Sequence, residues 1–263
     1  MGVRELLLVR HGESAGNVAA AAAHEAEAEV IDIDQRDADV PLSPLGVEQS
    51  RALGPALAEW VGSDDPPLVW SSTYVRAQET GRIGLDEAGL TLPIRLDERI
   101  RDRELGVLDL LTFRGVAARY PDEAERRLWL GKFYHRPAGG ESWADLMLRV
   151  RSFLSDLDQV ADGRRVLVLC HDVLVLAFRY VCEQLTEQQV LDISSSTPVR
   201  NVSLTRLVRQ EDQLGWTLVS FNDVSHLREE EVPVTQHPGE RRTVEADVPN
   251  PQESADGPGE RRE

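Results

Sequence analysis

The stretch Leu6-Leu7-Leu8-Val9-Arg10-His11-Gly12-Glu13-Ser14 decides the fold class. Its four aliphatic residues are typical of a strand that is buried on both faces of a parallel sheet. The run ends at Arg10 and His11, and Gly12 supplies the conformational freedom for a tight turn. An Ala-rich stretch from about residue 18 to residue 29 then predicts a helix. The sequence therefore opens with a strand-turn-helix unit.

The same unit recurs along the chain. Aliphatic runs and helical periodicity predict strands at 67–71, 165–170, 202–208 and 216–221, and helices at 43–60, 74–84, 141–157 and 173–185. Repeated strand-turn-helix units favour an α/β fold. We expect a three-layer α/β/α sandwich with a mostly parallel central sheet.

The composition changes after Arg228. Residues 229–263 hold ten acidic residues against four arginines, are rich in Pro and Gly, and show almost no aliphatic periodicity. Such a segment buries too little apolar surface to offset its conformational entropy. We expect one domain over residues 1–228 and an acidic, disordered tail over residues 229–263.

Composition also excludes several classes of function. A net charge of −17 argues against a nucleic-acid partner. No apolar run approaches the roughly 18–20 residues that span a membrane, and the run at the start is too short for a signal peptide. We therefore expect a cytoplasmic protein without a membrane partner. Cys170 and Cys182 have neither the number nor the spacing of a metal site or a disulfide framework. Whether the chain forms a homodimer is left open.

Unusual polar residues stand at or after three of the expected strand ends. They are Arg10-His11-Gly12, Tyr74-Val75-Arg76 and His171-Asp172. Active sites of such sheets lie outside the carboxyl ends of the strands, so these side chains could converge. Arginine forks and helix N-termini suit an anionic group such as phosphate. Taken singly, each residue also fits an ordinary structural role, but the repeated position predicts an anion-binding site.

The order of the motifs resembles that of the histidine phosphatase superfamily, in its phosphoglycerate mutase-like branch. The resemblance covers about residues 4–227. The matching segments are Arg10-His11-Gly12-Glu13-Ser14-x-x-Asn17, Asp39-x-Pro41-Leu42-Ser43-x-x-Gly46-x-x-Gln49, 71–80, Pro137-x-Gly139-Gly140-Glu141-Ser142, 166–171 and Asn201-x-Ser203-Leu204.

This resemblance implies a phosphotransfer reaction. His11 would attack phosphorus as a neutral imidazole and form a phosphohistidine, which water then hydrolyses. Arg10, Arg76 and His171 would hold the phosphoryl oxygens. The resemblance implies further contacts to the phosphoryl group from Gly12, Ser14 and Asn17, and it implies neither a metal nor an organic cofactor.

The proton donor to the leaving group is less well defined. Mutase-like members of the family carry a Glu four residues before a Gly, and counting back from Gly106 gives the shorter carboxylic acid Asp102. Glu104, Glu98 and Asp172 remain alternatives, the last because the acid-phosphatase branch uses the Asp after its second His. The resemblance does not decide between them.

Two further features bear on the substrate. Asp172 follows His171 where mutase-like members usually have Gly, which ranks mutase activity below hydrolysis. The segment 107–140 is expected to cap the substrate, because 132–140 resembles fructose-2,6-bisphosphatase domains, in which a Lys contacts a second phosphate. Lys132, Tyr134 and Arg136 are the candidate contacts. A solvated helical lid with ordinary surface charges is the alternative.

The sequence thus predicts a metal-independent phosphatase that hydrolyses a small phosphomonoester through phospho-His11. A phosphoglycerate mutase-type phosphotransferase is the first alternative, because a phosphohistidine can return its phosphate to a second hydroxyl. A non-catalytic module that binds a phosphorylated ligand is the second.

Overall fold

The computed structural model describes residues 2–62, 65–209 and 215–236. These residues form six strands and nine α-helices. The strands are β1 (Glu5–Arg10), β2 (Leu68–Ser71), β3 (Ile94–Leu96), β4 (Arg165–Cys170), β5 (Leu204–Arg209) and β6 (Trp216–Asp223). The helices are α1 (Ala15–Glu25), α2 (Pro44–Val61), α3 (Val75–Glu87), α4 (Phe113–Arg119), α5 (Pro121–Tyr134), α6 (Trp143–Val160), α7 (Asp172–Cys182), α8 (Glu187–Ser196) and α9 (Ser225–Glu229).

All six strands belong to one sheet, in the order β3-β2-β4-β1-β5-β6. Strands β3, β2, β4 and β1 are parallel, whereas β5 runs antiparallel to both β1 and β6. The mostly parallel sheet that the sequence predicts is therefore confirmed. Arg10 at the end of β1 pairs with Cys170 at the end of β4, so His11 and His171 leave the sheet side by side.

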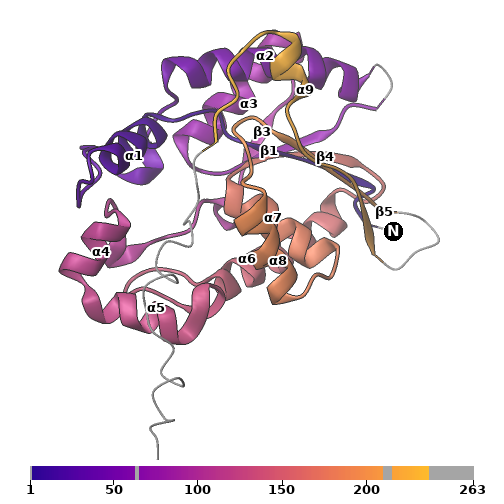
Figure 1. Cartoon of the computed structure of the whole chain (residues 1–263). Helices are drawn as coiled ribbons and strands as arrows, with labels where there is room; N and C mark the ends of the chain where they lie inside the picture. Colours follow the sequence, from indigo (N-terminus) through magenta and orange to yellow (C-terminus); the bar gives the residue numbers. More distant parts are fainter. Residues whose placement is uncertain (1, 63–64, 210–214, 237–263) are drawn as a thin grey trace, which may run out of the picture.

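Helices cover both faces of the sheet, with α2 and α3 on one face and α6 and α7 on the other (Figure 1). Successive side chains of a strand point to opposite faces, and β1 follows this rule. Leu7 and Val9 pack with residues of α2 and α3, while Leu6 and Leu8 pack with residues of α6 and α7. The three-layer α/β/α sandwich is thus built by strands that are apolar on both faces.

Local signals explain where the helices begin. Helix α1 starts at Ala15, earlier than the Ala-rich run indicates, because Ser14 and Asn17 form a capping box. Helix α6 starts in the same way, with Ser142 and Asp145 as the reciprocal pair. Strand β3 and helix α8 were not predicted, because neither carries a strong periodic pattern.

The segment between β3 and α6 forms α4 and α5, which lie away from the sheet (Figure 1). A β-bridge and backbone hydrogen bonds join this segment to the chain that follows α1. Val30 and Leu111 form an antiparallel bridge, and the Thr112 N–H donates to the Glu29 carbonyl at 3.1 Å. Gly115 packs directly against the Glu29 backbone, because a Cβ on Gly115 would lie 1.9 Å from the Glu29 carbonyl oxygen.

Residues 232 and 233, after the boundary expected at residue 228, contact the domain. Val232 packs against Ala52, Val224 and Leu227, and the Gln49 side chain donates to the carbonyl of Pro233 at 2.9 Å. One apolar side chain and one buried amide thus hold residues up to 236 on the domain, despite their acidic neighbours. The rest of the expected tail, 237–263, lies outside the described residues.

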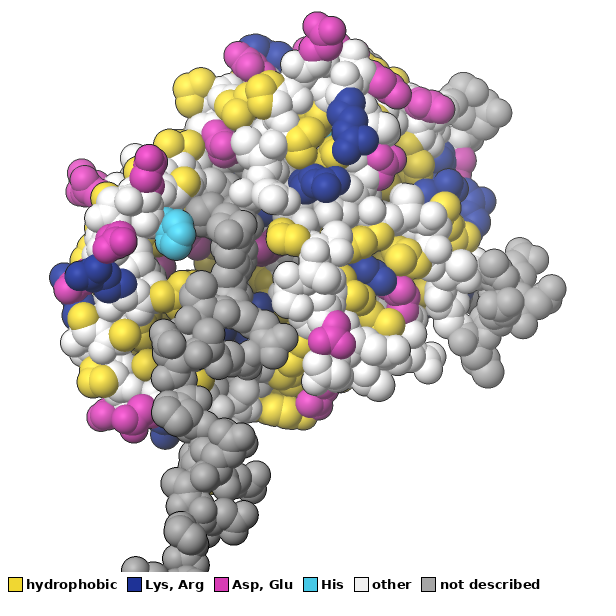
Figure 2. Space-filling view, in the orientation of Figure 1, with side chains coloured by type: hydrophobic (Ala, Val, Ile, Leu, Met, Phe, Trp, Pro, Cys, Tyr) yellow, Lys and Arg dark blue, Asp and Glu magenta, His cyan; other side chains and the backbone are white. Residues whose placement is uncertain are grey.

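Within the part of the chain that the structure describes, no helix combines the length and the apolar character needed to cross a membrane. Acidic, basic and hydrophobic side chains are interspersed over the face of the molecule shown in Figure 2.

Candidate functional site

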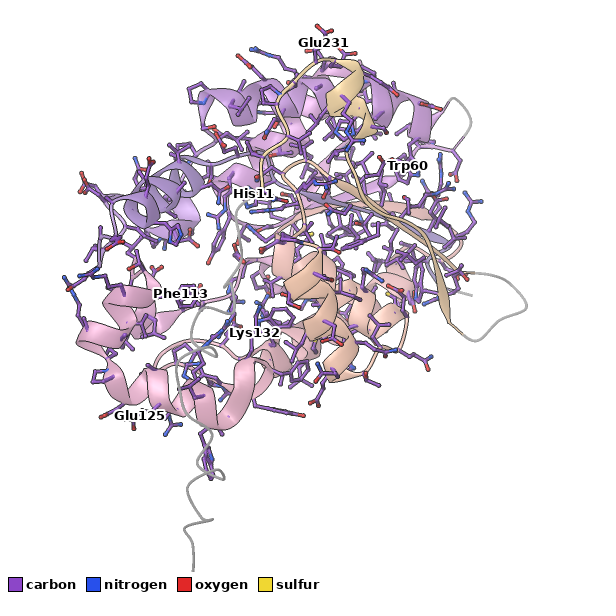
Figure 3. The ribbon with its side chains drawn as sticks, in the orientation of Figure 1. His11, Trp60, Phe113, Glu125, Lys132 and Glu231 are labelled. Atoms are coloured by element: carbon purple, nitrogen blue, oxygen red, sulfur yellow. The ribbon has the colours of Figure 1, made fainter. Side chains whose placement is uncertain are left out.

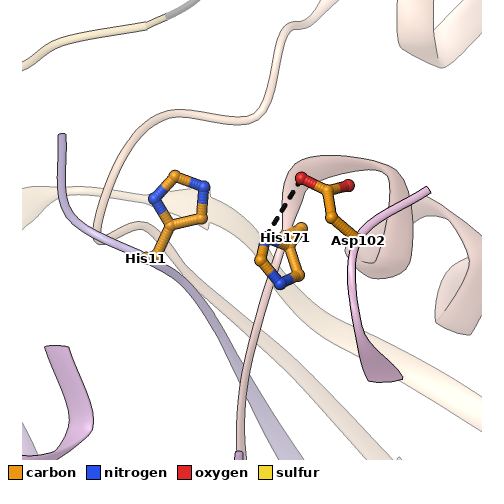
Figure 4. A group of neighbouring side chains, drawn as sticks. All are labelled: His11, Asp102 and His171. Carbon is orange, nitrogen blue, oxygen red and sulfur yellow. Dashed lines mark ion pairs between the residues drawn. The ribbon is translucent and has the colours of Figure 1, made fainter. Parts of the chain in front are cut away.

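The two histidines and one candidate acid meet at the carboxyl ends of β1 and β4. His11, Asp102 and His171 each offer a ligand atom within 4.8 Å of the others, and the two imidazole rings lie 5.2 Å apart (Figure 4). Arg10 and Arg76 line the same pocket, which has a volume of about 290 Å³. The sequence-predicted convergence is therefore present in the structure.

His11 is held in one tautomer. Its Nδ1 lies 2.6 Å from the carbonyl oxygen of Gly12. Because a carbonyl can only accept, Nδ1 carries the proton and Nε2 keeps its lone pair. Burial lowers the pKa of His11 well below its ordinary value, and the positive charges of Arg76, His171 and Arg10 lower it further. His11 is thus a neutral imidazole with a free lone pair at neutral pH.

Gly12 has a different role from the one expected. Its N–H donates to Thr80 Oγ1 at 2.9 Å, so this donor is already used within the protein. A Cβ on Gly12 would lie 2.7 Å from the carbonyl oxygen of Gly46, because the two backbones pass close to each other. Gly12 therefore supports the position of His11 and does not offer its N–H to the pocket.

Asn17 and Ser14 lie next to this turn and line the pocket. The Asn17 carbonyl oxygen accepts from the Ser14 N–H at 3.1 Å and from Asn201 Nδ2 at 3.4 Å. Asn201 also donates to the carbonyl of His11 at 3.0 Å. Since its oxygen is engaged, the amide nitrogen of Asn17 is the group that it can offer to an anion.

Arg10 is buried at the base of the pocket. Burial lowers the pKa of its guanidinium, and the carboxylates of Asp172 and Asp102 oppose that effect. One Nη group donates to the carbonyl of Val199, while Nε is buried without a hydrogen bond to any described residue. A buried donor without a partner is costly, and an anion in the pocket would satisfy it.

Arg76, from the first turn of α3, is held by two carboxylates. Its Nη1 lies 2.9 Å from Asp37 Oδ1, and its Nη2 lies 2.9 Å from Asp102 Oδ2. Burial alone would lower the pKa of Arg76, but the charges of Asp102 and Asp37 outweigh it and raise the pKa. Asp37 could not be predicted as a partner of Arg76, because only the folded chain brings it to α3.

His171 lies between Ser72 and Asp102, with a hydrogen bond at Nε2 and an ion-pair contact at Nδ1. Nε2 lies 2.8 Å from Ser72 Oγ, and Nδ1 lies 3.2 Å from Asp102 Oδ2. Burial favours the protonated form of Asp102, but the charges of His171 and Arg76 prevail and hold its pKa well below the ordinary value. In the free protein, Asp102 is therefore ionised. Its partners, His171 and Arg76, are also the groups that would bind an incoming phosphate.

The other carboxylates that the sequence suggested are placed differently. Glu104 accepts from the Tyr74 hydroxyl at 3.0 Å and is half-exposed. Glu98 is exposed in the 3₁₀ turn after β3, and neither Glu lines the pocket. Asp172 does line the pocket, with Oδ1 2.6 Å from the N–H of Val173. Geometry thus leaves Asp102 and Asp172 as acids within reach.

Of the three residues expected to contact the substrate from the capping segment, Lys132 is the one that lines the pocket. Lys132 lines the pocket from α5, where its Nζ donates to Ser194 Oγ at 3.0 Å and lies 4.8 Å from the ring of Trp143 (Figure 3). Tyr134 instead bonds to Glu187, and Arg136 pairs with Asp145. The expectation for Tyr134 and Arg136 differs from the structure, because both side chains find partners on neighbouring helices outside the pocket.

His11, Asp102 and His171 are spaced closely enough to be considered as metal ligands. The surroundings favour an anion, because the guanidinium groups of Arg10 and Arg76 line the same pocket. Nε2 of His171 is in addition hydrogen-bonded to Ser72 Oγ. The donor set fits a phosphoryl group better than a divalent cation.

Comparison with known proteins agrees with this geometry. The sequence profile of the histidine phosphatase superfamily (branch 1) matches residues 6–224. This chain belongs to the histidine phosphatase superfamily. The superfamily's members are phosphatases and mutases, and named relatives of both kinds are similar to the chain.

Curated proteins similar to this chain include mutases. The 2,3-bisphosphoglycerate-dependent phosphoglycerate mutase of Sinorhizobium fredii is 33% identical over 197 residues, which is 74% of this chain and 86% of the mutase. The mutase of the same name from Methylobacterium radiotolerans is 34% identical over 200 residues, 74% of this chain and 87% of that protein.

Solved structures similar to this chain include phosphatases. A mycobacterial glucosyl-3-phosphoglycerate phosphatase in complex with VO3 has a TM-score of 0.66 and 27% identity, and the match covers 84% of this chain and 100% of that one. The α-ribazole phosphatase of Shigella flexneri has a TM-score of 0.65 at 21% identity, and the match covers 83% of this chain and 96% of that one. At this identity, the similarity shows only that the fold is shared. The histidine phosphatase fold is thus shared with enzymes that release phosphate.

Proposed function

We propose that this histidine phosphatase hydrolyses a small phosphomonoester through a phosphohistidine on His11, without a metal. The observation that carries the proposal is the bond between His11 Nδ1 and the Gly12 carbonyl, which leaves Nε2 as a neutral nucleophile. Arg10 and Arg76 flank that nucleophile in the same pocket. They supply the positive charge that a transferring phosphoryl group requires.

The reaction proceeds in two displacements. In the first, His11 Nε2 forms a bond to phosphorus, the ester P–O bond breaks, and the departing alcohol oxygen takes a proton from Asp102. In the second, a water molecule attacks phosphorus, the P–N bond breaks, and inorganic phosphate leaves. The Asp102 carboxylate accepts the proton from that water, which restores the starting state.

Asp102 must gain a proton before the first step. A bound phosphate dianion competes with it for Arg76 and His171, the two groups that hold its pKa low in the free protein. The phosphate also adds negative charge beside the carboxylate. Both effects raise the pKa of Asp102 when substrate binds, so that binding itself prepares the acid.

A mutase-type transfer is the second candidate, because curated relatives at 33% identity carry that name. The two activities differ in where phosphate goes. A mutase returns the phosphoryl group of phospho-His11 to a second hydroxyl and requires a bisphosphorylated primer. A phosphatase releases inorganic phosphate without a primer.

The test uses His11→Asn beside His24→Asn, an exposed histidine of α1 that serves as the matched control. The wild type and the control should hydrolyse p-nitrophenyl phosphate and form an acid-labile, base-stable phosphoprotein. The His11 variant should do neither. An unchanged rate in His11→Asn would overturn the nucleophile, and primer-dependent transfer without phosphate release would favour the mutase.

A further inference from the structure

A group of apolar side chains lines the pocket without belonging to the hydrophobic core. Ile31 and Ile33 come from the chain after α1, and Leu110 and Leu111 come from the chain before α4. All four are partly exposed, and within the described residues none is a member of the core clusters around the sheet. We call these four residues the apolar wall.

The wall is a built structure and is held by backbone hydrogen bonds. The Ile31 N–H donates to the carbonyl of Leu110 at 2.8 Å, and Val30 and Leu111 form the bridge beside it. The two segments are about eighty residues apart in sequence and still form one surface. Its apolar side chains are therefore fixed in place facing the pocket.

The backbone of Leu110 is strained. Its φ is 57°, in the left-handed region that Gly and Asn adopt at lower cost than Leu. The conformation is maintained because the Leu110 N–H donates to Asp109 Oδ1 at 3.0 Å and its carbonyl accepts from Ile31. Strain of this kind is concentrated at functional sites. A leucine kept at such a position indicates that its side chain is needed there.

Two carboxylates flank the wall, whereas the further cations that line the pocket, Lys132 and Arg103, donate to Ser194 Oγ and to the carbonyl of Glu141. Asp37 and Asp109 line the same pocket, and burial together with the charge of Asp37 raises the pKa of Asp109. Arg10 and Arg76 line the pocket together with His11, where they would bind the phosphoryl group. A carboxylate on the alcohol part of the substrate would lose its hydration against apolar surface and face these aspartates.

We propose that the apolar wall selects phosphomonoesters of uncharged alcohols with an apolar chain or ring, and rejects esters whose alcohol carries a carboxylate. The inference rests on the proposed phosphatase function and specifies its substrate class. A pocket of about 290 Å³ is of the size that holds a small organic group beside the phosphate.

The test compares hexyl phosphate with the phosphate ester of 6-hydroxyhexanoate. Both have a primary alcohol as the leaving group, so a difference in rate reports recognition of the far end. We expect kcat/KM for hexyl phosphate to be at least ~10-fold higher, the discrimination that apolar contacts of this size give. Equal values, or a preference for the carboxylate ester, would overturn the inference while leaving the phosphatase activity established. Absence of phosphate release from both esters and from p-nitrophenyl phosphate would instead overturn the function on which it rests.

A variant pair separates the wall from general stability. Leu110→Asn tolerates the left-handed backbone but removes apolar surface, and Leu128→Asn makes the same change at a residue of α5 that is 51% exposed. Leu110→Asn should lower kcat/KM for hexyl phosphate ~3–10-fold through KM, and leave the carboxylate ester within ~2-fold. Leu128→Asn should change neither. An equal loss on both esters in Leu110→Asn would mean that Leu110 has only a structural role.

Charge is tested separately with Asp109→Asn. The amide oxygen still accepts from the Leu110 N–H, so the backbone of the wall is retained. We expect this variant to raise the ratio of kcat/KM for the carboxylate ester to kcat/KM for hexyl phosphate. A fall in this ratio would contradict the role assigned to Asp109.

Discussion

The carboxylate of Asp102 lies 3.2 Å from Nδ1 of His171, on the same oxygen that receives the guanidinium of Arg76 at 2.9 Å. Two groups that are proposed to hold phosphate thus hold the proposed acid in the free protein. The arrangement explains how one carboxylate is ionised before substrate binds and protonated afterwards. Substrate binding and proton supply are therefore coupled through Arg76 and His171.

Replacing the acid should affect poor leaving groups most. Asp102→Asn should lower kcat on an alkyl phosphate by about 10²–10⁴, the usual contribution of a general acid, and lower it far less on p-nitrophenyl phosphate. Glu104→Gln and Asp172→Asn are the matched comparisons, and steady-state phosphate release measures all three. A leaving-group-dependent loss in Asp172→Asn alone would transfer the role to that residue.

Asp37 should weaken the affinity of the pocket for anions. Its carboxylate accepts from both Nη groups of Arg76, which a phosphoryl group would also need. Asp37→Asn should therefore lower the inhibition constant for inorganic phosphate, by ~3–10-fold for the release of one charged partner. Asp39→Asn is the control, since Asp39 belongs to the same 3₁₀ turn and pairs with the exposed Arg36. A rise of the constant in Asp37→Asn would show that Asp37 positions Arg76 instead of competing for it.

The ionisation of His11 should be visible directly. An unperturbed imidazole takes up a proton as the pH falls through about 6.5, whereas burial and three nearby cations lower the pKa of His11 well below that value. We expect the His11 resonance, assigned by its loss in His11→Asn, to remain in the neutral position through pH 6.5 in an NMR titration. A midpoint at or above pH 6.5 would contradict the electrostatic account of the nucleophile.

His226 should make stability depend on pH. Burial lowers its pKa to about 4, against the opposing effects of Asp223 and the Val202 backbone. Between the ordinary pKa of about 6.5 and pH 4, the unfolded chain binds a proton that the folded chain does not, so stability falls as the pH falls through this window. His226→Gln should lose this slope, which corresponds to ~2–3 kcal/mol across the window in urea unfolding. An unchanged slope would assign the dependence to other groups.

The sequence was sufficient for five of the six described strands and for the residues at the ends of β1 and β4. The burial of β1 on both faces follows from four consecutive aliphatic residues, and the turn after it follows from Gly12. His11 and His171 could be predicted to converge because parallel strands end at one edge. These features depend on local patterns and on the rules of parallel sheets.

What could not be predicted depends on contacts between distant segments. Asp37 reaches Arg76, and Ile31 reaches Leu110, only after the chain has folded. Tyr134 and Arg136 were expected at the pocket because of their neighbours in sequence, yet Glu187 and Asp145 bind them elsewhere. A resemblance in sequence identifies which residues are present and does not determine the direction of exposed side chains on a helix.

The apolar wall is separate from the packed core, and this separation has an evolutionary consequence. Ile33 and Leu111 belong to none of the core clusters of the described residues. Mutations there can therefore be accepted at little cost in foldability, while the phosphoryl chemistry is inherited unchanged. New substrate preferences can therefore evolve through substitutions at a few positions of the apolar wall, while the catalytic residues stay unchanged.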